Sequence, residues 1–148
     1  MSSILKISEA TSLGLHAMVA MAQQPDGPLT CKEIAASFGV SQAHLAKVLH
    51  RMGKVGLVRS VRGARGGFVL ARRADRIALM HIYEAIEGPL PPGDCLFAAP
   101  VCKQRECILG KLLESVNSQF VDYMEKTKLS ELAARMGPIR PAGGVETE

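Results

Sequence analysis

The feature that most constrains this chain is a pair of helix boundaries separated by one residue. Thr30 and Glu33 have the spacing of a capping box, in which each side chain bonds to the other residue's backbone N–H. The helix that follows is expected to end at Gly39, because glycine tolerates the left-handed conformation of a helix cap. Only Val40 separates this end from Ser41, which can cap the next helix. Two short helices joined by so tight a turn predict a helix-turn-helix.

The second of these helices has an apolar side and a polar, basic side. Its apolar residues recur at helical spacing and predict the buried side: Leu45, Val48, Leu49 and Met52. In a DNA-binding helix-turn-helix, the beginning of this second helix meets the base edges. The residues that we expect to contact DNA here are Ser41, Gln42, His44, Lys47 and Arg51. A helical hairpin with no role in DNA binding is the alternative.

A β-hairpin with a basic tip is predicted directly after this motif. Residues 57–61 and 67–70 have strand-forming side chains, and the loop between them holds two glycines together with Arg62 and Arg65. Arginines at such a tip can enter a minor groove, where narrow A·T-rich stretches concentrate negative potential. A helix-turn-helix followed by this hairpin predicts a DNA-binding winged helix. A winged helix that serves as a protein–protein interaction module is the main alternative.

The charge of the chain is concentrated in one half. Residues 1–76 hold eleven Lys and Arg against four Asp and Glu, whereas residues 77–148 hold seven against ten. A basic half indicates a polyanionic partner for that half, and a solvated basic surface is the alternative on charge alone. The excess falls mainly on residues 47–76, with nine basic residues and one acid. This distribution favours the DNA-binding interpretation.

Other helices are predicted on both sides of the winged helix. Residues 8–23 and 77–87 have apolar residues at helical spacing. A third stretch, from Ile108 to about Lys126, carries an apolar stripe of about five turns, longer than a three-helix head needs for its own core. We expect this stripe to pair with a second copy of the chain, and folding back over its own domain is the alternative. A short helix at residues 129–136 is expected next.

Three of the four cysteines gather in one predicted loop: Cys95, Cys102 and Cys107. The glycines and prolines just before them suit a loop rather than a helix or strand. We expect a cytoplasmic protein, because residues 1–8 lack the pattern of a secretory signal and no apolar run could cross a bilayer. In that reducing compartment, clustered thiols indicate metal or redox chemistry rather than structural disulfides. Their spacing lacks the CxxC pairs of structural zinc sites and of ferredoxins.

The remaining chemistry-bearing residues have simpler interpretations. Cys31 is far from the loop in sequence, so we expect a small buried residue rather than a distal ligand. His81 is expected to be packed or solvent-facing rather than a ligand. The sequence shows no assignable Ser-His-Asp arrangement, no phosphate-binding glycine loop before a helix and no carboxylate pair in a cleft-like setting. We therefore predict no enzyme.

Together these segments resemble the Rrf-type winged-helix transcription regulators of bacteria. The resemblance covers about residues 7–136, and its motifs are residues 41–49, 56–58, 61–68, 77–79 and 84–88 with the three loop cysteines. It implies a mainly α fold with a small β-hairpin wing and a long C-terminal dimerisation helix. It also implies a homodimeric regulator, usually a repressor, of a double-stranded DNA operator. The wing arginine that enters the minor groove in relatives matches Arg62.

The resemblance also implies a cofactor. In the cluster-binding members, three cysteines of this loop hold a [2Fe–2S] or [4Fe–4S] cluster, and the matching residues are Cys95, Cys102 and Cys107. Members without these cysteines work without a cluster, so a regulator of the same fold that uses thiol–disulfide chemistry or zinc is the alternative. An electron-transfer protein that holds a cluster without binding an operator is less favoured.

The fourth ligand and the cluster type are left open by the resemblance. Some members supply a histidine three residues after the third cysteine, where this chain has Gly110. Others supply an acidic residue from the first helix of the partner subunit, where this chain has Ser12. Glu9 and His16 stand one turn away on either side of Ser12 and are the substitutes that we consider.

Four regions are expected along the chain. They are a winged helix-turn-helix DNA-binding domain (residues 1–88), a cysteine-bearing sensor loop (89–107), a dimerisation helix with a short terminal helix (108–136) and a disordered tail (137–148).

Overall fold

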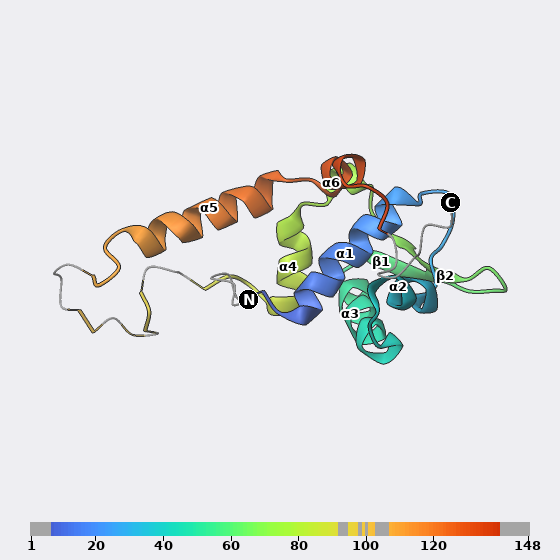
Figure 1. Cartoon of the computed structure of the whole chain (residues 1–148), viewed down its shortest axis with the longest axis horizontal. Helices are drawn as coiled ribbons and strands as arrows, with labels where there is room; N and C mark the ends of the chain where they lie inside the picture. Colours follow the sequence, from blue (N-terminus) through green and yellow to red (C-terminus); the bar gives the residue numbers. More distant parts are fainter. Residues whose placement is uncertain (1–6, 92–94, 98, 100, 103–106, 140–148) are drawn as a thin grey trace, which may run out of the picture.

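The computed structural model describes residues 7–91, 95–97, 99, 101–102 and 107–139. Within these residues it forms six α-helices and one antiparallel strand pair, which confirms the predicted mainly α fold with a β-hairpin wing (Figure 1). In chain order the elements are α1 (Glu9–Gln23), α2 (Cys31–Phe38), α3 (Gln42–Lys54), β1 (Val58–Val61), β2 (Gly67–Leu70), η1 (Ala74–Arg76), α4 (Leu79–Glu87), α5 (Leu112–Lys126) and α6 (Leu129–Arg135).

The helix-turn-helix is confirmed, and its caps are those that the sequence predicts. The Glu33 backbone N–H donates to the Thr30 hydroxyl at 3.1 Å, and the Thr30 backbone N–H donates to the Glu33 carboxylate at 2.7 Å. Gly39 adopts the left-handed conformation, with φ 66°. The Ser41 hydroxyl then accepts from the backbone N–H of His44 at the start of α3. These local bonds fix the angle at which α3 leaves α2.

The hydrophobic core lies between α1, α3, α4 and α6. Helix α1 crosses the middle of this head and contacts the other three helices. The fully buried side chains include Met18 from α1, Leu45 and Leu49 from α3, Ile82 from α4 and Leu129 from α6. Burying these apolar surfaces is the main stabilising term for the head. It also fixes which side of α3 is left exposed.

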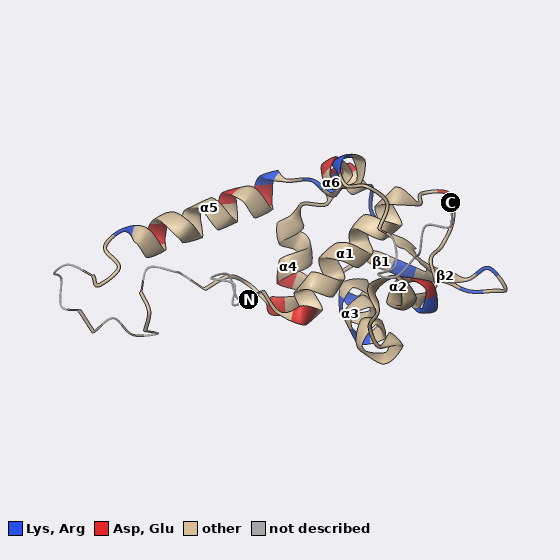
Figure 2. Cartoon of the chain, viewed as in Figure 1, with Lys and Arg blue, Asp and Glu red and all other residues tan. Residues whose placement is uncertain are grey.

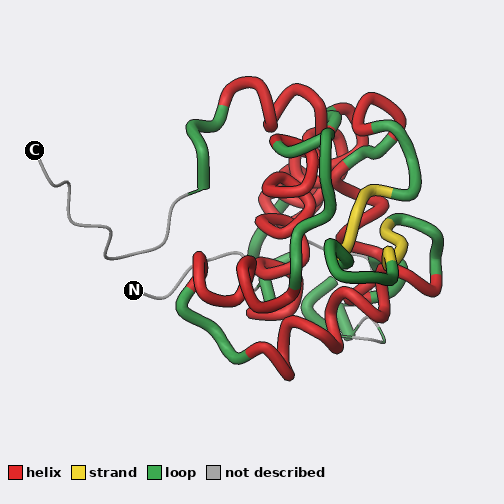
Figure 3. Tube along the Cα trace, turned by 90° about the vertical axis from the view of Figure 1, so that its right-hand side faces the viewer, coloured by secondary structure: helices red, strands yellow, loops and turns green. Residues whose placement is uncertain are grey.

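The wing is a two-stranded hairpin at one side of the helical body (Figures 1 and 3). Strands β1 and β2 pair in antiparallel register from Val58 opposite Leu70 to Val61 opposite Gly67. The turn at the tip is closed by a 3.0 Å hydrogen bond from the Gly66 N–H to the Gly63 carbonyl. Arg62 and Arg65 are both exposed on this tip.

Backbone hydrogen bonds between the segments that precede α4 and α6 hold α6 against the head. The Leu129 N–H donates to the Ile77 carbonyl at 2.9 Å, and the Leu79 N–H donates to the Thr127 carbonyl at 3.1 Å. Helix α4 lies within the predicted range 77–87 and begins at Leu79, because residue 77 takes part in this pairing. His81 is exposed, and its Nδ1 accepts from the backbone N–H of Ala78 at 3.1 Å, so this ring serves as a helix cap.

The long helix is shorter than the apolar pattern predicts. Residues 108–111 form a turn, and α5 begins at Leu112. The reason is Gly110, whose φ of 55° lies in the left-handed region and whose N–H donates to the Cys107 carbonyl at 2.8 Å. The prediction of a helix from Ile108 is therefore wrong by about one turn.

Helix α5 projects away from the head (Figure 1). Its second half packs on α4, where the rings of Tyr83 and Phe120 meet edge to face at 5.5 Å. Met124 is the buried residue within α5. The alternative in which the stripe folds back over its own domain therefore holds for this half, whereas Leu112 at the other end is 60% exposed.

The first residues of the expected disordered tail lie against α1. The Gln23 side-chain amide donates to the carbonyls of Met136 at 3.0 Å and Gly137 at 3.2 Å. Ile139 then packs against the core. These contacts order residues 137–139, and residues 140–148 lie outside the described residues.

Candidate nucleic-acid interface and cysteine loop

The exposed face of α3 carries a line of basic side chains. Because Leu45, Val48, Leu49 and Met52 are buried, the opposite face of the helix points to solvent. Lys47, His50 and Lys54 recur there at spacings of three and four residues and are all exposed. We call these three residues the basic ridge. The DNA contacts predicted from the sequence do not include His50 and Lys54, although their helical spacing from Lys47 is a signal that could have identified them.

Basic side chains also line a groove between the ridge and the wing. This groove has a volume of about 410 Å³, and its wall includes His50, Lys54, Arg59, Ser60 and Phe68. Figure 2 shows Lys and Arg on α3 and on the loop that joins β1 to β2. A phosphate backbone is the polyanion that such a surface attracts. Helix α3 and the wing therefore form one continuous candidate nucleic-acid interface.

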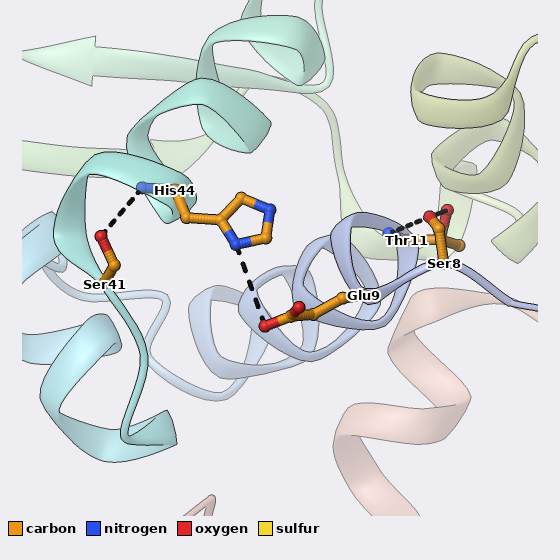
Figure 4. A network of polar contacts seen from close by, with 5 residues as sticks. All are labelled: Ser8, Glu9, Thr11, Ser41 and His44. Carbon is orange, nitrogen blue, oxygen red and sulfur yellow. Dashed lines mark hydrogen bonds and ion pairs between the residues drawn. The ribbon is translucent and has the colours of Figure 1, made fainter.

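Two of the predicted DNA contacts lie on a different side of α3. The His44 Nδ1 atom is 3.9 Å from a carboxylate oxygen of Glu9 on α1 (Figure 4). The Arg51 guanidinium donates to the backbone carbonyl of Ile86 on α4 at 3.3 Å. We call His44 and Arg51 the inner flank of α3. Gln42, in contrast, is exposed at the beginning of the helix.

The three candidates for a fourth ligand lie on one face of α1. Glu9, Ser12 and His16 line a pocket of about 340 Å³ whose wall also includes Phe38 and Val40. The His16 Nδ1 atom lies 2.6 Å from the Ser12 carbonyl oxygen, and the His16 ring meets the Phe38 ring edge-on at 6.0 Å. In the described part of the chain, none of the loop cysteines lines this pocket. Among the described residues of one chain, the loop cysteines therefore do not come together with the three candidates for a fourth ligand.

The loop cysteines are free thiols. Cys102 is exposed, whereas Cys95 and Cys107 are half-buried. The Cys95 sulfur accepts from the backbone N–H of Phe97 at 3.5 Å. Among the residues that the structure describes, no three His, Cys, Asp or Glu side chains gather closely enough to hold a metal ion. The chemistry of the donor set fits an iron–sulfur cluster, because three reduced thiols follow one another on a single loop.

Cys31 differs from the loop cysteines in its surroundings. Its thiol is half-buried at the start of α2 and donates to the Gln42 carbonyl at 3.4 Å. Burial raises the pKa of the Cys31 thiol. Its side chain packs against the core, so Cys31 is a packing residue with a hydrogen bond.

A winged helix-turn-helix with a basic recognition helix and wing defines a class of DNA-binding transcription regulators. The chain belongs to the Rrf2 family, whose model, described as an iron-dependent transcriptional regulator, matches residues 7–135. Members of this family are DNA-binding transcription regulators rather than enzymes. In the described residues, no helix has the length and apolarity needed to span a membrane.

Solved structures support the same assignment. CymR (YrzC), the global cysteine regulator of B. subtilis, is 30% identical, with 90% of this chain and 100% of that chain covered and a TM-score of 0.78. T. potens IscR is 28% identical, with coverage of 90% and 93% and a TM-score of 0.68. Staphylococcus aureus CymR is 27% identical, with coverage of 88% and 99% and a TM-score of 0.71.

Proposed function

We propose that this chain is a homodimeric repressor that binds a double-stranded DNA operator and senses redox, nitric oxide or iron–sulfur status through a cluster. Cys95, Cys102 and Cys107 would hold the cluster. The observation that carries this proposal is the set of three free thiols on the loop between α4 and α5 of an Rrf2 winged helix. Three other parts of the molecule also support it, namely α3 with the wing, the helix α5 and the pocket on α1.

DNA binding is assigned to α3 and the wing. Ser41, Gln42 and Lys47 would meet the major groove at the start of the recognition helix. Arg62 and Arg65, exposed at the wing tip, would reach the adjacent minor groove. His44 and Arg51 would contribute through the orientation of α3, because both already contact neighbouring helices.

Dimerisation is assigned to α5. Along this helix the side chains of Leu112 and Tyr123 are 60% and 53% exposed. An apolar surface of this kind is stabilised when another surface covers it, and a two-fold copy satisfies both surfaces at once. A two-fold dimer would also place two recognition helices for a symmetric operator.

The sensing chemistry is assigned to the cysteine loop. When bound, a cluster would supply an iron centre that reacts with oxygen or nitric oxide. The loop thiols would ligate it, and Ser12, Glu9 or His16 on α1 of the partner subunit would complete the ligand set. All three candidates line one pocket, so this face of α1 presents them together.

Selection of duplexes from a random-sequence pool tests the DNA-binding part of the proposal. The anaerobically reconstituted protein should enrich a two-fold symmetric site whose half-sites lie roughly 34–36 Å apart, or a multiple of that distance. Affinity for that site should fall steeply as salt rises, because phosphate contacts release counterions. Enrichment of no shared sequence, or affinity that is independent of salt, would contradict DNA recognition by this chain.

A cluster-free sensor of the same fold is a second candidate. It is favoured by the exposed Cys102 thiol and by the likeness to Staphylococcus aureus CymR solved in an oxidized form, which is 27% identical with a TM-score of 0.72. Such a sensor would form a disulfide or sulfenic acid at the loop, or hold zinc there. Elemental analysis and intact-mass measurement before and after peroxide treatment separate these outcomes from an iron–sulfur cluster.

A further inference from the structure

We propose that Glu87 is a positioning residue that links the beginning of the cysteine loop to the recognition helix α3. This inference rests on the proposed function in one respect, namely that the loop senses and α3 reads DNA. Glu87 is the last residue of α4, and the next residue, Gly88, has a φ of 83°. Glu87 therefore stands at the junction where the helix ends and the loop begins.

The Glu87 carboxylate holds the first turn of α1. Its Oε1 atom accepts a 2.5 Å hydrogen bond from the Thr11 hydroxyl and a second hydrogen bond from the Ser8 hydroxyl. Ser8 is the N-cap of α1, and Thr11 is fully buried. These two hydroxyls lower the pKa of the Glu87 carboxyl, and the positive charge of Arg51 contributes to the same shift. The carboxylate is therefore held in its charged, hydrogen-bonded form.

The same turn of α4 also holds α3. The Arg51 guanidinium of the inner flank donates to the Ile86 carbonyl, one residue before Glu87. Ile86 itself is buried and packs against α1 at Gly14, where a β-carbon would collide with the Ile86 side chain. The last turn of α4 is thus bonded to α1 and α3 within two consecutive residues.

A second contact joins α1 directly to α3. In the turn of α1 that begins at Ser8, the Glu9 carboxylate lies 3.9 Å from the His44 ring (Figure 4). The first turn of α1 therefore touches α4 through Thr11 and α3 through Glu9. A displacement at the end of α4 has two routes to the inner flank of α3, one through Arg51 and one through α1.

The basic ridge moves with this inner flank, because both lie on one rigid helix. Lys47 is three residues from His44 and four from Arg51. On this account, cluster occupancy at the cysteine loop changes the position of Glu87 and, through these contacts, the presentation of α3 to DNA. Coupling between two sites in proteins typically changes an affinity by about 5–150-fold.

Two matched pairs of variants test this inference. Glu87→Gln removes the charge, and Glu84→Gln changes an exposed carboxylate one turn earlier on α4 as the control. Thr11→Val removes the hydroxyl at nearly constant shape, whereas Thr11→Ser retains it. The first measurement is hydrogen exchange of the cluster-free protein. Glu87→Gln and Thr11→Val should raise exchange in the first turn of α1 and in α3, and both controls should match the wild type.

The second measurement is the ratio of operator dissociation constants with and without the cluster. Glu87→Gln and Thr11→Val should bind iron and sulfide like the wild type. Their ratio should nevertheless lie close to one, because most of the roughly 5–150-fold coupling between the cluster and operator affinity would be lost. Ratios and exchange rates that equal those of the controls would overturn the role of Glu87. A wild type that holds no cluster would overturn the proposed function instead, and hydrogen exchange alone would then decide the role of Glu87.

Discussion

Leu29 and Phe68 exchange two backbone hydrogen bonds across the helix-turn-helix and the wing. The Leu29 N–H donates to the Phe68 carbonyl at 3.0 Å, and the Phe68 N–H donates to the Leu29 carbonyl at 2.8 Å. Leu29 directly precedes the N-cap of α2, and Phe68 lies in β2. These two bonds fix the wing to the segment that begins the helix-turn-helix. They therefore set the position of the wing tip relative to α3.

Gly67→Ala should destabilise this anchored wing. Gly67 has a φ of 155°, and a β-carbon there would lie 2.6 Å from the Leu29 carbonyl oxygen. Because that neighbour is backbone, we expect a loss of about 1–3 kcal/mol in the free energy of unfolding, measured by urea denaturation. Gly27→Ala is the control, since nothing lies within 4 Å of its added β-carbon. Equal stabilities for the two variants would show that the Leu29–Phe68 contact does not restrain Gly67.

Arg62→Ala should weaken DNA binding without unfolding the protein. Arg62 is exposed at the wing tip, so its removal costs contacts with DNA rather than contacts within the chain. We expect the affinity for a selected duplex with A·T-rich flanks to fall about tenfold, measured by fluorescence anisotropy. Arg73→Ala is the control, because that guanidinium is paired with Asp75 at 2.7 Å. If both variants bind like the wild type, the wing does not contact the operator.

The contribution of Glu87 to stability should depend on pH. Hydrogen bonds from Ser8 and Thr11 lower the pKa of Glu87 in the folded protein. The stabilisation is therefore present above the unfolded pKa, roughly 4.3, and is lost as the pH falls through the lower folded pKa. The wild type should exceed Glu87→Gln in unfolding free energy at pH 7, and the difference should narrow below about pH 4. A difference that stays constant between these pH values would contradict a depressed pKa.

Leu112→Gln should weaken the proposed dimer. The Leu112 side chain is 60% exposed in the single chain, and α5 carries it away from the head. We expect Leu112 to belong to the minority of interface residues whose truncation costs more than about 1 kcal/mol, which corresponds to a rise of roughly fivefold or more in the dimer dissociation constant. Sedimentation equilibrium measures this constant, with Glu114→Gln on the same helix as the control. A dissociation constant that matches the control would place the dimer interface elsewhere.

The local features of this fold are predictable from sequence because their causes are local. The Thr30–Glu33 capping box, the left-handed Gly39 and the Ser41 cap each depend on residues within a few positions of one another. Gly110 shows the limit of this reasoning. The apolar spacing continues through residues 108–111, but the left-handed glycine interrupts the helix there.

The contacts that orient the candidate site have no such local signal. Thr11 and Glu87 are 76 residues apart, and their hydrogen bond arises only when α1 and α4 pack together. His44 and Arg51 look like ordinary exposed polar residues of a recognition helix. Their direction toward α1 and α4 follows from the packing of three helices, which no single helical pattern contains.

The visible absorption spectrum of protein reconstituted with iron and sulfide under anaerobic conditions tests the central claim most directly. The wild type and Cys31→Ala should be brown, with the visible absorption typical of thiolate-bound iron–sulfur clusters. Cys102→Ala should lose this colour together with its bound iron and acid-labile sulfide. A colourless wild type, or a Cys102→Ala variant with the full spectrum, would contradict a cluster held by Cys95, Cys102 and Cys107.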